Sequence, residues 1–476
     1  MNKIRKTKII CTIGPASSSE DMITKLIKAG MNCARINCSH GTAQERQPIV
    51  ASLKKIRKEL NYPLSILMDT KGPEFRIKTF KDGKAYIKDG SKFSFTTDDI
   101  EGDETKVAVT YDKLCKDLKK GDTILVNDGL VKFEVEKVTD HNVHCKTIIG
   151  GELSNHKSMN FPGKDLSLEF LSESDKQDLL FAIKNDFDFV ACSFVSCAED
   201  IKSVRDFMYD NGGAKIALIA KIENQSGIDN LAEICKYCDG VMVARGDLGV
   251  EVDYDKLPVI QKQIILSCIR SGKLAVTSTE MLESMIENPR PTRAEISDVA
   301  NAVYDGSSAV MLSGETAVGK YPVEAVEAMS KIAMSAEGAI PYKDLLPLRK
   351  PVVEGRTVDA IAKATCTVAI NVEAKGIVNL SASGFTSELI SNFRPPVDVA
   401  TITSQKKEFY KLGLYWGINP IFEAPRETVT NLEVLNIAKK YAKDVLGLKE
   451  GDKFVLNSGW QDDEVGYTNS LLVETI

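Results

Sequence analysis

Short apolar runs rich in β-branched residues recur through the first two thirds of the chain and predict buried strands. Most are followed by a segment in which apolar residues return every three or four positions, as in 21–29 (DMITKLIKA), which predicts a helix. Strands that alternate with helices indicate parallel β–α units, and eight such runs predict a closed (β/α)8 barrel, the TIM-barrel fold. The runs span residues 8–13, 32–36, 65–68, 188–192, 215–220, 240–244, 274–277 and 309–312.

The third and fourth runs lie about 120 residues apart, far more than one helix needs. That interval contains further short strand-like runs separated by Asp-Gly and Gly-Asp turns, which favour hairpins. We therefore predict a small β-barrel lid domain, residues 72–167, inserted into a loop of the barrel. The remaining segments, 1–71 and 168–344, have a combined length close to the ~250 residues typical of such barrels.

The alternation begins again after Pro351. Helical patterns at 358–371 and 431–446 are interleaved with apolar runs such as 376–380 and 453–456. Residues 345–476 are therefore predicted to form a separate C-terminal α/β domain.

Composition narrows the class of protein. The 476 residues include 61 Lys and Arg against 67 Asp and Glu, a net charge of −6, which argues against a nucleic-acid binder that relies on overall charge. No apolar run is long enough to cross a membrane, so a cytoplasmic protein is expected. The CxxC motif Cys235–Cys238 has no second cysteine pair, which favours buried thiols over a zinc or redox site.

Polar residues gather where the predicted barrel strands end, which is where TIM barrels carry their active sites. Glu223 and Asp247 offer the hard oxygen ligands that suit Mg²⁺, and Arg35, Arg76 and Lys221 offer positive charge for a phosphoryl group. Taken singly, Lys221 and Glu223 could form a surface ion pair, and Asp247 could cap a helix. Their convergence on one rim favours phosphoryl transfer, which depends on positioning and charge stabilisation.

At these residues the chain resembles the pyruvate kinase family over essentially its whole length. The matching segments are TKIICTIGPAS (7–17), GMNCARINCSHG (30–41), DTKGPEFR (69–76), KIEN (221–224), VARGDLGV (243–250), NPRPTRAEISDVAN (288–301) and MLSGETAVGKYPV (311–323). The resemblance implies a barrel, a mobile lid and a C-terminal effector domain. It also implies a cytoplasmic, homotetrameric enzyme that transfers the phosphoryl group of phosphoenolpyruvate to ADP in the last step of glycolysis.

The resemblance also implies roles for individual residues. The implied Mg²⁺ (or Mn²⁺) ligands are Glu223 and Asp247. Substrate contacts fall on Arg35, Lys221, Gly246, Asp247 and Thr279, with Arg76 assisting, and the proton for enolpyruvate would come from Thr279 or from a water relay near Ser313 and Glu315. The implied K⁺ site comprises Asn37, Ser39, Asp69 and the Thr70 carbonyl, with Glu74 at a position linked to K⁺ dependence, and the nucleotide contacts are Arg35, Asn37, His40 and Lys157.

The C-terminal domain departs from the family pattern. Ser381, Ser383, Gly384 and Thr386 match an effector phosphate loop, but Phe385 stands where Arg is usual. A later loop carries three consecutive acids at 462–464, which should repel a bisphosphate. The expected effector is therefore a sugar monophosphate or AMP.

The sequence leaves two other functions open. One is a catalytically silent paralogue that binds metabolites, which the intact set of candidate residues disfavours. The other is a lyase or aldolase that acts on phosphoenolpyruvate. The inserted domain disfavours it, because such an enzyme needs no lid over a nucleotide.

Overall fold

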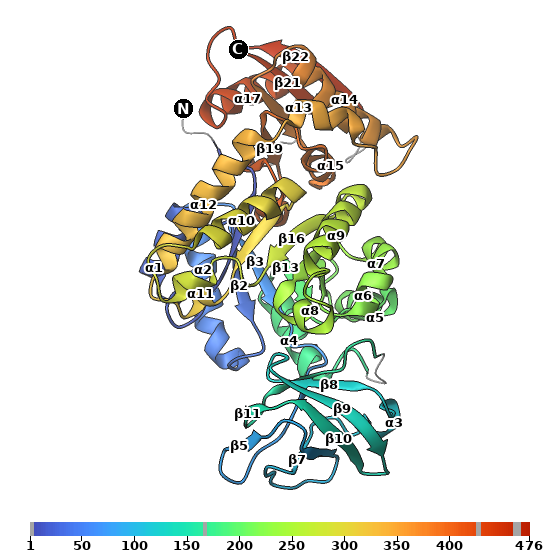
Figure 1. Cartoon of the computed structure of the whole chain (residues 1–476). Coiled ribbons are helices and arrows are strands. Elements are labelled where there is room, and N and C mark those ends of the chain that lie inside the picture. The colour runs from blue at the N-terminus through green and yellow to red at the C-terminus, as the bar shows by residue number, and fades with distance from the viewer. Residues whose placement is uncertain (1–3, 165–168, 425–429, 460–467) are drawn as a thin grey trace.

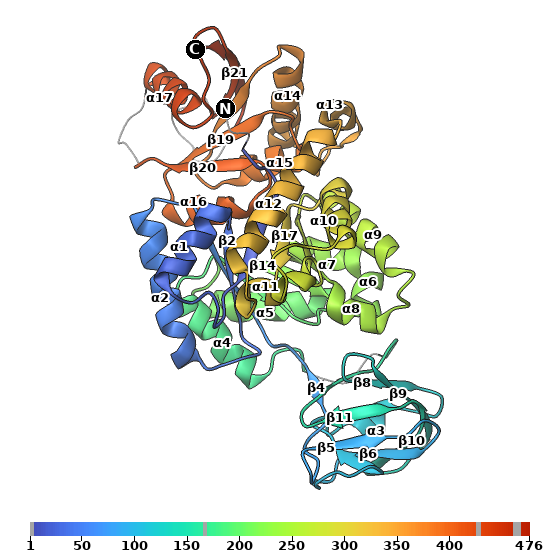
Figure 2. The same cartoon turned by 60° about the vertical axis from the view of Figure 1, so that its left-hand side comes forward.

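The computed structural model describes residues 4–164, 169–424, 430–459 and 468–476. A barrel occupies the middle of the molecule, with a mainly β domain at one end and a C-terminal α/β domain at the other (Figures 1 and 2). The predicted boundary between lid and barrel at 167–168 lies outside the described residues.

Eight parallel strands close the barrel in the order β1-β17-β16-β15-β14-β13-β3-β2, as the hydrophobic pattern predicts. The pairing of Lys8 with Ala309 joins the first strand to the last. The strands are β1 (Lys8–Thr12), β2 (Cys33–Asn37), β3 (Ser65–Asp69), β13 (Phe189–Cys192), β14 (Ala217–Ile222), β15 (Gly240–Ala244), β16 (Leu274–Ser278) and β17 (Ala309–Leu312). Nearly every strand residue is buried, because side chains fill the barrel on one face and helices cover the other.

The covering helices begin and end at residues that satisfy their free backbone groups. Thr42 with Glu45, and Thr292 with Glu295, form capping boxes in which each side chain bonds the other residue's backbone N–H. Gly306 ends a helix at φ +101°, which a side chain would disfavour. The barrel helices are α1 (Glu20–Ala29), α2 (Ala43–Glu59), α4 (Glu173–Lys184), α5 (Ala198–Asp210), α6 (Gln225–Asp229), α7 (Leu231–Tyr237), α8 (Arg245–Glu251), α9 (Leu257–Ser271), α10 (Arg293–Asp305), α11 (Gly314–Ala317) and α12 (Pro322–Ala339).

The lid has a sheet and a core of its own. Its seven-stranded sheet runs β4-β12-β8-β9-β10-β6-β7, and a bridge between Ile77 and Val109 links the two end strands. Phe93, Phe95 and Phe133 pack with ring centroids 5.0–5.2 Å apart inside it. The lid strands are β4 (Phe75–Arg76), β5 (Lys84–Ile87), β6 (Lys92–Thr96), β7 (Lys106–Ala108), β8 (Thr123–Val126), β9 (Val131–Val138), β10 (Asn142–Ile149), β11 (Gly151–Ser154) and β12 (Ser158–Asn160), and its short helix is α3 (Leu114–Asp117).

The C-terminal domain packs against the end of the barrel where the strands begin. Lys8 Nζ donates to the Ile418 carbonyl and Ser65 Oγ to the Tyr410 carbonyl, both at 2.7 Å. Its sheet runs β20-β19-β18-β21-β22, with β22 antiparallel. The elements are α13 (Tyr342–Leu345), α14 (Thr357–Asn371), β18 (Gly376–Leu380), α15 (Phe385–Phe393), β19 (Asp398–Thr403), α16 (Lys406–Lys411), β20 (Ile418–Phe422), α17 (Asn431–Asp444), β21 (Lys453–Ser458) and β22 (Ser470–Thr475).

This arrangement leaves the carboxyl ends of the barrel strands facing the lid. Among the described residues, no helix is both long and apolar enough to cross a membrane.

Candidate active site

A buried network of charges joins three strands at the rim beneath the lid. Asp69, at the end of β3, accepts a hydrogen bond from Arg35 Nε at 2.6 Å and another from Lys221 Nζ at 3.0 Å. Lys221 Nζ also lies 3.0 Å from Glu223 Oε1 and donates to Ser193 Oγ at 2.6 Å. The network therefore fixes one ammonium group between two carboxylates.

The charges of this network lower the pKa of Asp69 and raise that of Lys221. Burial alone would raise the pKa of Asp69, but the Arg35 and Lys221 charges hold it below its usual range. Burial would lower the pKa of Lys221, yet the Asp69 and Glu223 charges raise it. Lys221 therefore remains a cation at the centre of the rim.

Glu223 and Asp247 lack enough positive charge around them. Burial raises the pKa of Glu223 to about 7, opposed by Lys221 and reinforced by Asp247. Burial also raises the pKa of Asp247. Two crowded carboxylates of this kind suit a divalent cation, which would restore their ionised forms.

Thr279 directly follows β16 and lies next to the start of α8. Its Oγ1 accepts a hydrogen bond from Gly246 N–H at 2.7 Å and donates to the Ser278 carbonyl at 2.6 Å. The Thr279 backbone is left-handed, with φ +65°. The structure thus brings Thr279 and Gly246 together, beside Asp247.

Ser313 and Glu315 follow β17, but their groups differ in availability. Glu315 is buried, and its two oxygens accept from the backbone N–H of Leu282 at 3.0 Å and of Ser313 at 2.7 Å. Ser313 Oγ has no hydrogen-bond partner among the described residues. The Glu315 carboxylate therefore orients backbone, and the Ser313 hydroxyl is the freer of the two groups.

The predicted K⁺ ligands lie at or just beyond the ends of β2 and β3, where Asn37 pairs in register with Asp69. Asn37 Oδ1 accepts from Ser39 N–H at 3.1 Å, and Ser193 Oγ donates to the Thr70 carbonyl at 2.7 Å. Sequence reasoning missed Ser193. Its signal was modest: it is the first polar residue after the fourth strand.

Three predicted residues lie outside this network. Arg76, on β4, pairs with Glu74 and with the His156 carbonyl, in the segments that connect lid and barrel. Lys157 directly precedes β12 in the lid, and its carbonyl accepts a hydrogen bond from Ile77 N–H at 3.0 Å. His40 is exposed in the loop after β2. Among the contacts between described residues, none joins Arg76, Lys157 or His40 to Lys221.

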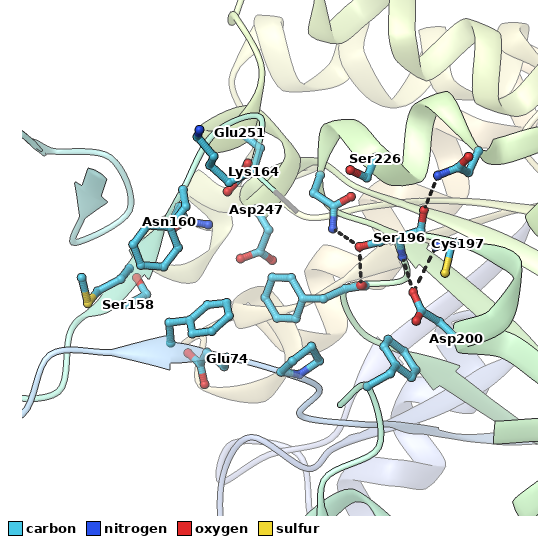
Figure 3. Close-up of a pocket in the computed structure, with 18 residues that line it drawn as sticks. Glu74, Ser158, Asn160, Lys164, Ser196, Cys197, Asp200, Ser226, Asp247 and Glu251 are labelled. Atoms are coloured by element: carbon cyan, nitrogen blue, oxygen red, sulfur yellow. Dashed lines mark hydrogen bonds between the residues drawn. The ribbon is translucent and has the colours of Figure 1, made fainter. Parts of the chain in front are cut away.

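A cavity of about 450 Å³ extends from Asp247 beneath the lid connections. Figure 3 shows Asn160 and Lys164 from the lid side, Asp247 and Glu251 from α8, and Ser196 and Asp200 beyond them. Glu251 accepts hydrogen bonds from the Asn160 side chain and the Phe161 N–H, and burial raises its pKa to about 7. The lid therefore contacts the same helix that carries Asp247.

The predicted effector loop follows β18 in the C-terminal domain. Gly384 has φ +78°, and Thr386 Oγ1 lies 2.7 Å from Thr468 Oγ1. The Phe385 ring lies 4.9 Å from the Arg356 guanidinium. Ser381 and Ser383 belong to this loop, whereas the acidic segment 462–464 lies outside the described residues.

Comparison with known proteins decides the family. Residues 4–326 match the model of the pyruvate kinase barrel domain, and residues 359–474 match that of the pyruvate kinase alpha/beta domain. The chain belongs to the pyruvate kinase family.

Relatives of the chain agree with this family over its full length. The pyruvate kinase of Clostridium acetobutylicum is 42% identical over 474 residues, covering 99% of this chain and 100% of the relative. That of Staphylococcus aureus (strain USA300) is 43% identical over 476 residues, covering 99% of this chain and 81% of the relative. The crystal structure of a pyruvate kinase from Cryptosporidium parvum superposes with a TM-score of 0.94 at 34% identity, covering 99% of this chain and 96% of that one. The predicted barrel fold and membership of a phosphotransferase family are confirmed.

Proposed function

We propose that this chain transfers the phosphoryl group of phosphoenolpyruvate to ADP, giving pyruvate and ATP in the last step of glycolysis, with Mg²⁺ (or Mn²⁺) and K⁺ as cofactors. Sequence similarity to pyruvate kinases supports this reaction. The observation that carries the proposal is the buried Lys221 ammonium, held between Asp69 and Glu223 at the rim that faces the lid.

Glu223 and Asp247 would hold the divalent cation. Their raised pKa values mark two neighbouring carboxylates, that of Glu223 buried and that of Asp247 accessible to solvent, which a cation would stabilise in the ionised form. Once bound, Mg²⁺ would neutralise charge on the substrate phosphate and help to orient it. The oxygen atoms of Asn37, Ser39, Asp69 and Thr70 would hold K⁺.

Arg35 and Lys221 would bind and stabilise the phosphoryl group. Arg35 is fixed by Asp69 through Nε and by Thr12 Oγ1 at 2.8 Å through Nη1, and its Nη2 makes no hydrogen bond among the described residues. Nη2 would therefore be a donor for a phosphate oxygen. The Lys221 ammonium would stabilise the charge that spreads over the transferring group.

The proton for enolpyruvate would pass through hydroxyl groups rather than a carboxyl group. Both Glu315 oxygens are occupied by backbone N–H donors, which supports a role in orienting the Ser313 segment. The Thr279 and Ser313 hydroxyls are the remaining candidates, directly or through water. Lid closure would exclude water and bring Lys157 and Arg76 to the nucleotide and phosphate, where Asn37 and His40 would also contact the nucleotide.

We further propose a cytoplasmic homotetramer that responds to a sugar monophosphate or AMP. Exposed apolar side chains on α10, Ile296 and Tyr304, supply surface for subunit contacts. Ser381, Ser383, Gly384 and Thr386 form the polar loop that would take the effector phosphate.

The test is pyruvate formation from phosphoenolpyruvate and ADP with Mg²⁺, in K⁺ buffer and in tetramethylammonium buffer. We expect rapid turnover that collapses without K⁺. Turnover that is indifferent to K⁺ would refute the ion site alone. Absence of turnover from folded protein, with AMP or a sugar monophosphate present, would refute the proposed reaction and favour a silent paralogue.

A further inference from the structure

The loop after β16 holds an unusual backbone conformation. Thr279 and Glu280 both have positive φ, +65° and +51°, although neither is glycine. Two consecutive residues in this region are strained, and such strain persists only where the surroundings hold the backbone in place. Some group must therefore hold Thr279, whose hydroxyl is proposed to act in catalysis.

Arg245, the first residue of α8, contacts both strained residues. Its Nη2 donates to the Thr279 carbonyl at 2.7 Å and to the Glu280 carbonyl at 3.0 Å, and its Nε lies 3.2 Å from the Thr279 carbonyl. The arginine is 7% exposed. One guanidinium therefore satisfies the carbonyl groups of both left-handed residues.

A second contact fixes the side chain of the same threonine. Gly246, the next residue after Arg245, donates its N–H to Thr279 Oγ1 at 2.7 Å. Asp247, the candidate metal ligand, comes one residue later. The Arg245–Asp247 tripeptide thus sets the Thr279 carbonyl, the Thr279 hydroxyl and a metal-binding carboxylate relative to one another.

The guanidinium is itself anchored, and the loop has another attachment. Arg245 Nη1 donates to Asp298 Oδ1 on α10 at 2.8 Å. Leu282 N–H, further along the loop, is held separately by Glu315 Oε1 at 3.0 Å. Loss of Arg245 would therefore leave the loop attached at Leu282 but free Thr279 and Glu280 to relax toward negative φ.

We propose that Arg245 is a positioning residue that acts through Thr279, holding its hydroxyl where the reaction needs it. The expected effect on kcat rests on the proposed function, whereas the expected effect on the position of Thr279 does not. Lysine cannot replace the arginine, because a single ammonium cannot reproduce the fork that joins two carbonyl groups to Asp298.

The test is a double-mutant cycle between Arg245→Lys and Thr279→Ala, with kcat and KM for phosphoenolpyruvate measured for each variant. We expect Arg245→Lys alone to lower kcat about 100-fold, since a displacement of about 1 Å at a reacting group costs that much. KM should change less than about threefold. In the Thr279→Ala background the same change should cost less than about threefold, since its target is gone.

Arg205→Lys is the matched control. Arg205 also donates two hydrogen bonds to one backbone carbonyl, that of Tyr237, and pairs with Asp239, but away from the rim. Its kcat should stay within about twofold of the parent enzyme. Additive losses in the cycle, or a raised KM with unchanged kcat, would overturn the proposal.

A crystal structure of Arg245→Lys tests the positioning without any activity. The proposal expects Thr279 to leave positive φ or its hydroxyl to leave Gly246 N–H. A variant that keeps both features overturns it, even if the parent chain shows no turnover. Lack of turnover in the parent would refute the proposed reaction alone.

Discussion

Two polar segments of this molecule follow buried parallel strands, yet they differ in how their charges are held. At the barrel rim, Asp69 binds Arg35 at 2.6 Å and Lys221 at 3.0 Å, and the three residues come from three different strands. In the C-terminal domain, Arg356 pairs with Asp359 three residues away and stacks on Phe385. A closed barrel brings charged groups from distant strand ends together, whereas the ion pair in the C-terminal domain joins two residues within one helical turn.

The comparison teaches that the rim is organised before substrate arrives, while the C-terminal loop retains a solvent-exposed aromatic ring. Phe385 is 39% exposed, whereas Asp69 is fully buried. Changes at the rim should therefore lower kcat, and changes in the C-terminal domain should leave kcat unchanged.

The largest expected effect is that of Lys221→Met, which should lower kcat about 1000-fold or more, because it removes the charge that we propose stabilises the transferring phosphoryl group. Binding of phosphoenolpyruvate in the presence of Mg²⁺ should be largely retained, as measured by equilibrium dialysis. Lys55→Met removes an exposed ion pair with Glu20 and should leave kcat unchanged. A fully active Lys221→Met variant would contradict the proposed role.

The next effect separates the two regions directly. Asp69→Asn should lower kcat about 100-fold, because Arg35 and Lys221 lose the carboxylate that positions both. Asp359→Asn is the matched change in the C-terminal domain, where a buried carboxylate pairs with Arg356. It should lower the melting temperature without lowering kcat. Equal kcat losses in the two variants would remove the distinction between rim and loop.

The junction between barrel and C-terminal domain should show a pH dependence. Burial lowers the pKa of Lys8 to about 7, so the folded chain binds fewer protons than the unfolded chain between about pH 7 and 10.5. Stability contributed by this group therefore rises as pH increases through that range. Lys8→Met should raise the melting temperature by about 2 °C or more at pH 7, and this gain should shrink by pH 10. A gain that is constant with pH would show that Lys8 is not buried in its neutral form.

The smallest expected effect is that of Phe385→Arg. It adds a cation to the proposed effector loop, next to Arg356, and should strengthen activation by a sugar phosphate about tenfold, with basal kcat unchanged. Leu432→Arg adds the same charge at an exposed position on α17 and should have no effect. Activation curves measured with glucose 6-phosphate as the probe would decide, and a changed basal kcat would contradict the separation of the two regions.

Sequence reasoning located the eight barrel strands because their hydrophobic runs are continuous and, apart from the interval that holds the lid, similarly spaced. It placed the fifth strand two residues too early: β14 extends through Ile222, so Lys221 lies within the strand. It also selected Lys221, Glu223 and Asp247 as candidate site residues, because charged residues at strand ends are visible in the sequence, and their roles stay predictions. It missed Ser193 and gave no role to Arg245, because a serine and an arginine carry no signal until their partners are known.

The sequence alone determined the alternation of strands and helices, the position of the inserted β domain and the charged residues at the strand ends. Those features depend on local hydrophobic periodicity and on turn residues, which act over a few positions along the chain. Only the tertiary structure decided that Asp69 binds both Arg35 and Lys221, that both Glu315 oxygens are occupied, and that Arg245 holds Thr279 and Glu280. Except for the bond from Ser313 N–H to Glu315, these contacts join residues that are 33–152 positions apart in the sequence. Closure of the barrel brings such groups within hydrogen-bonding distance.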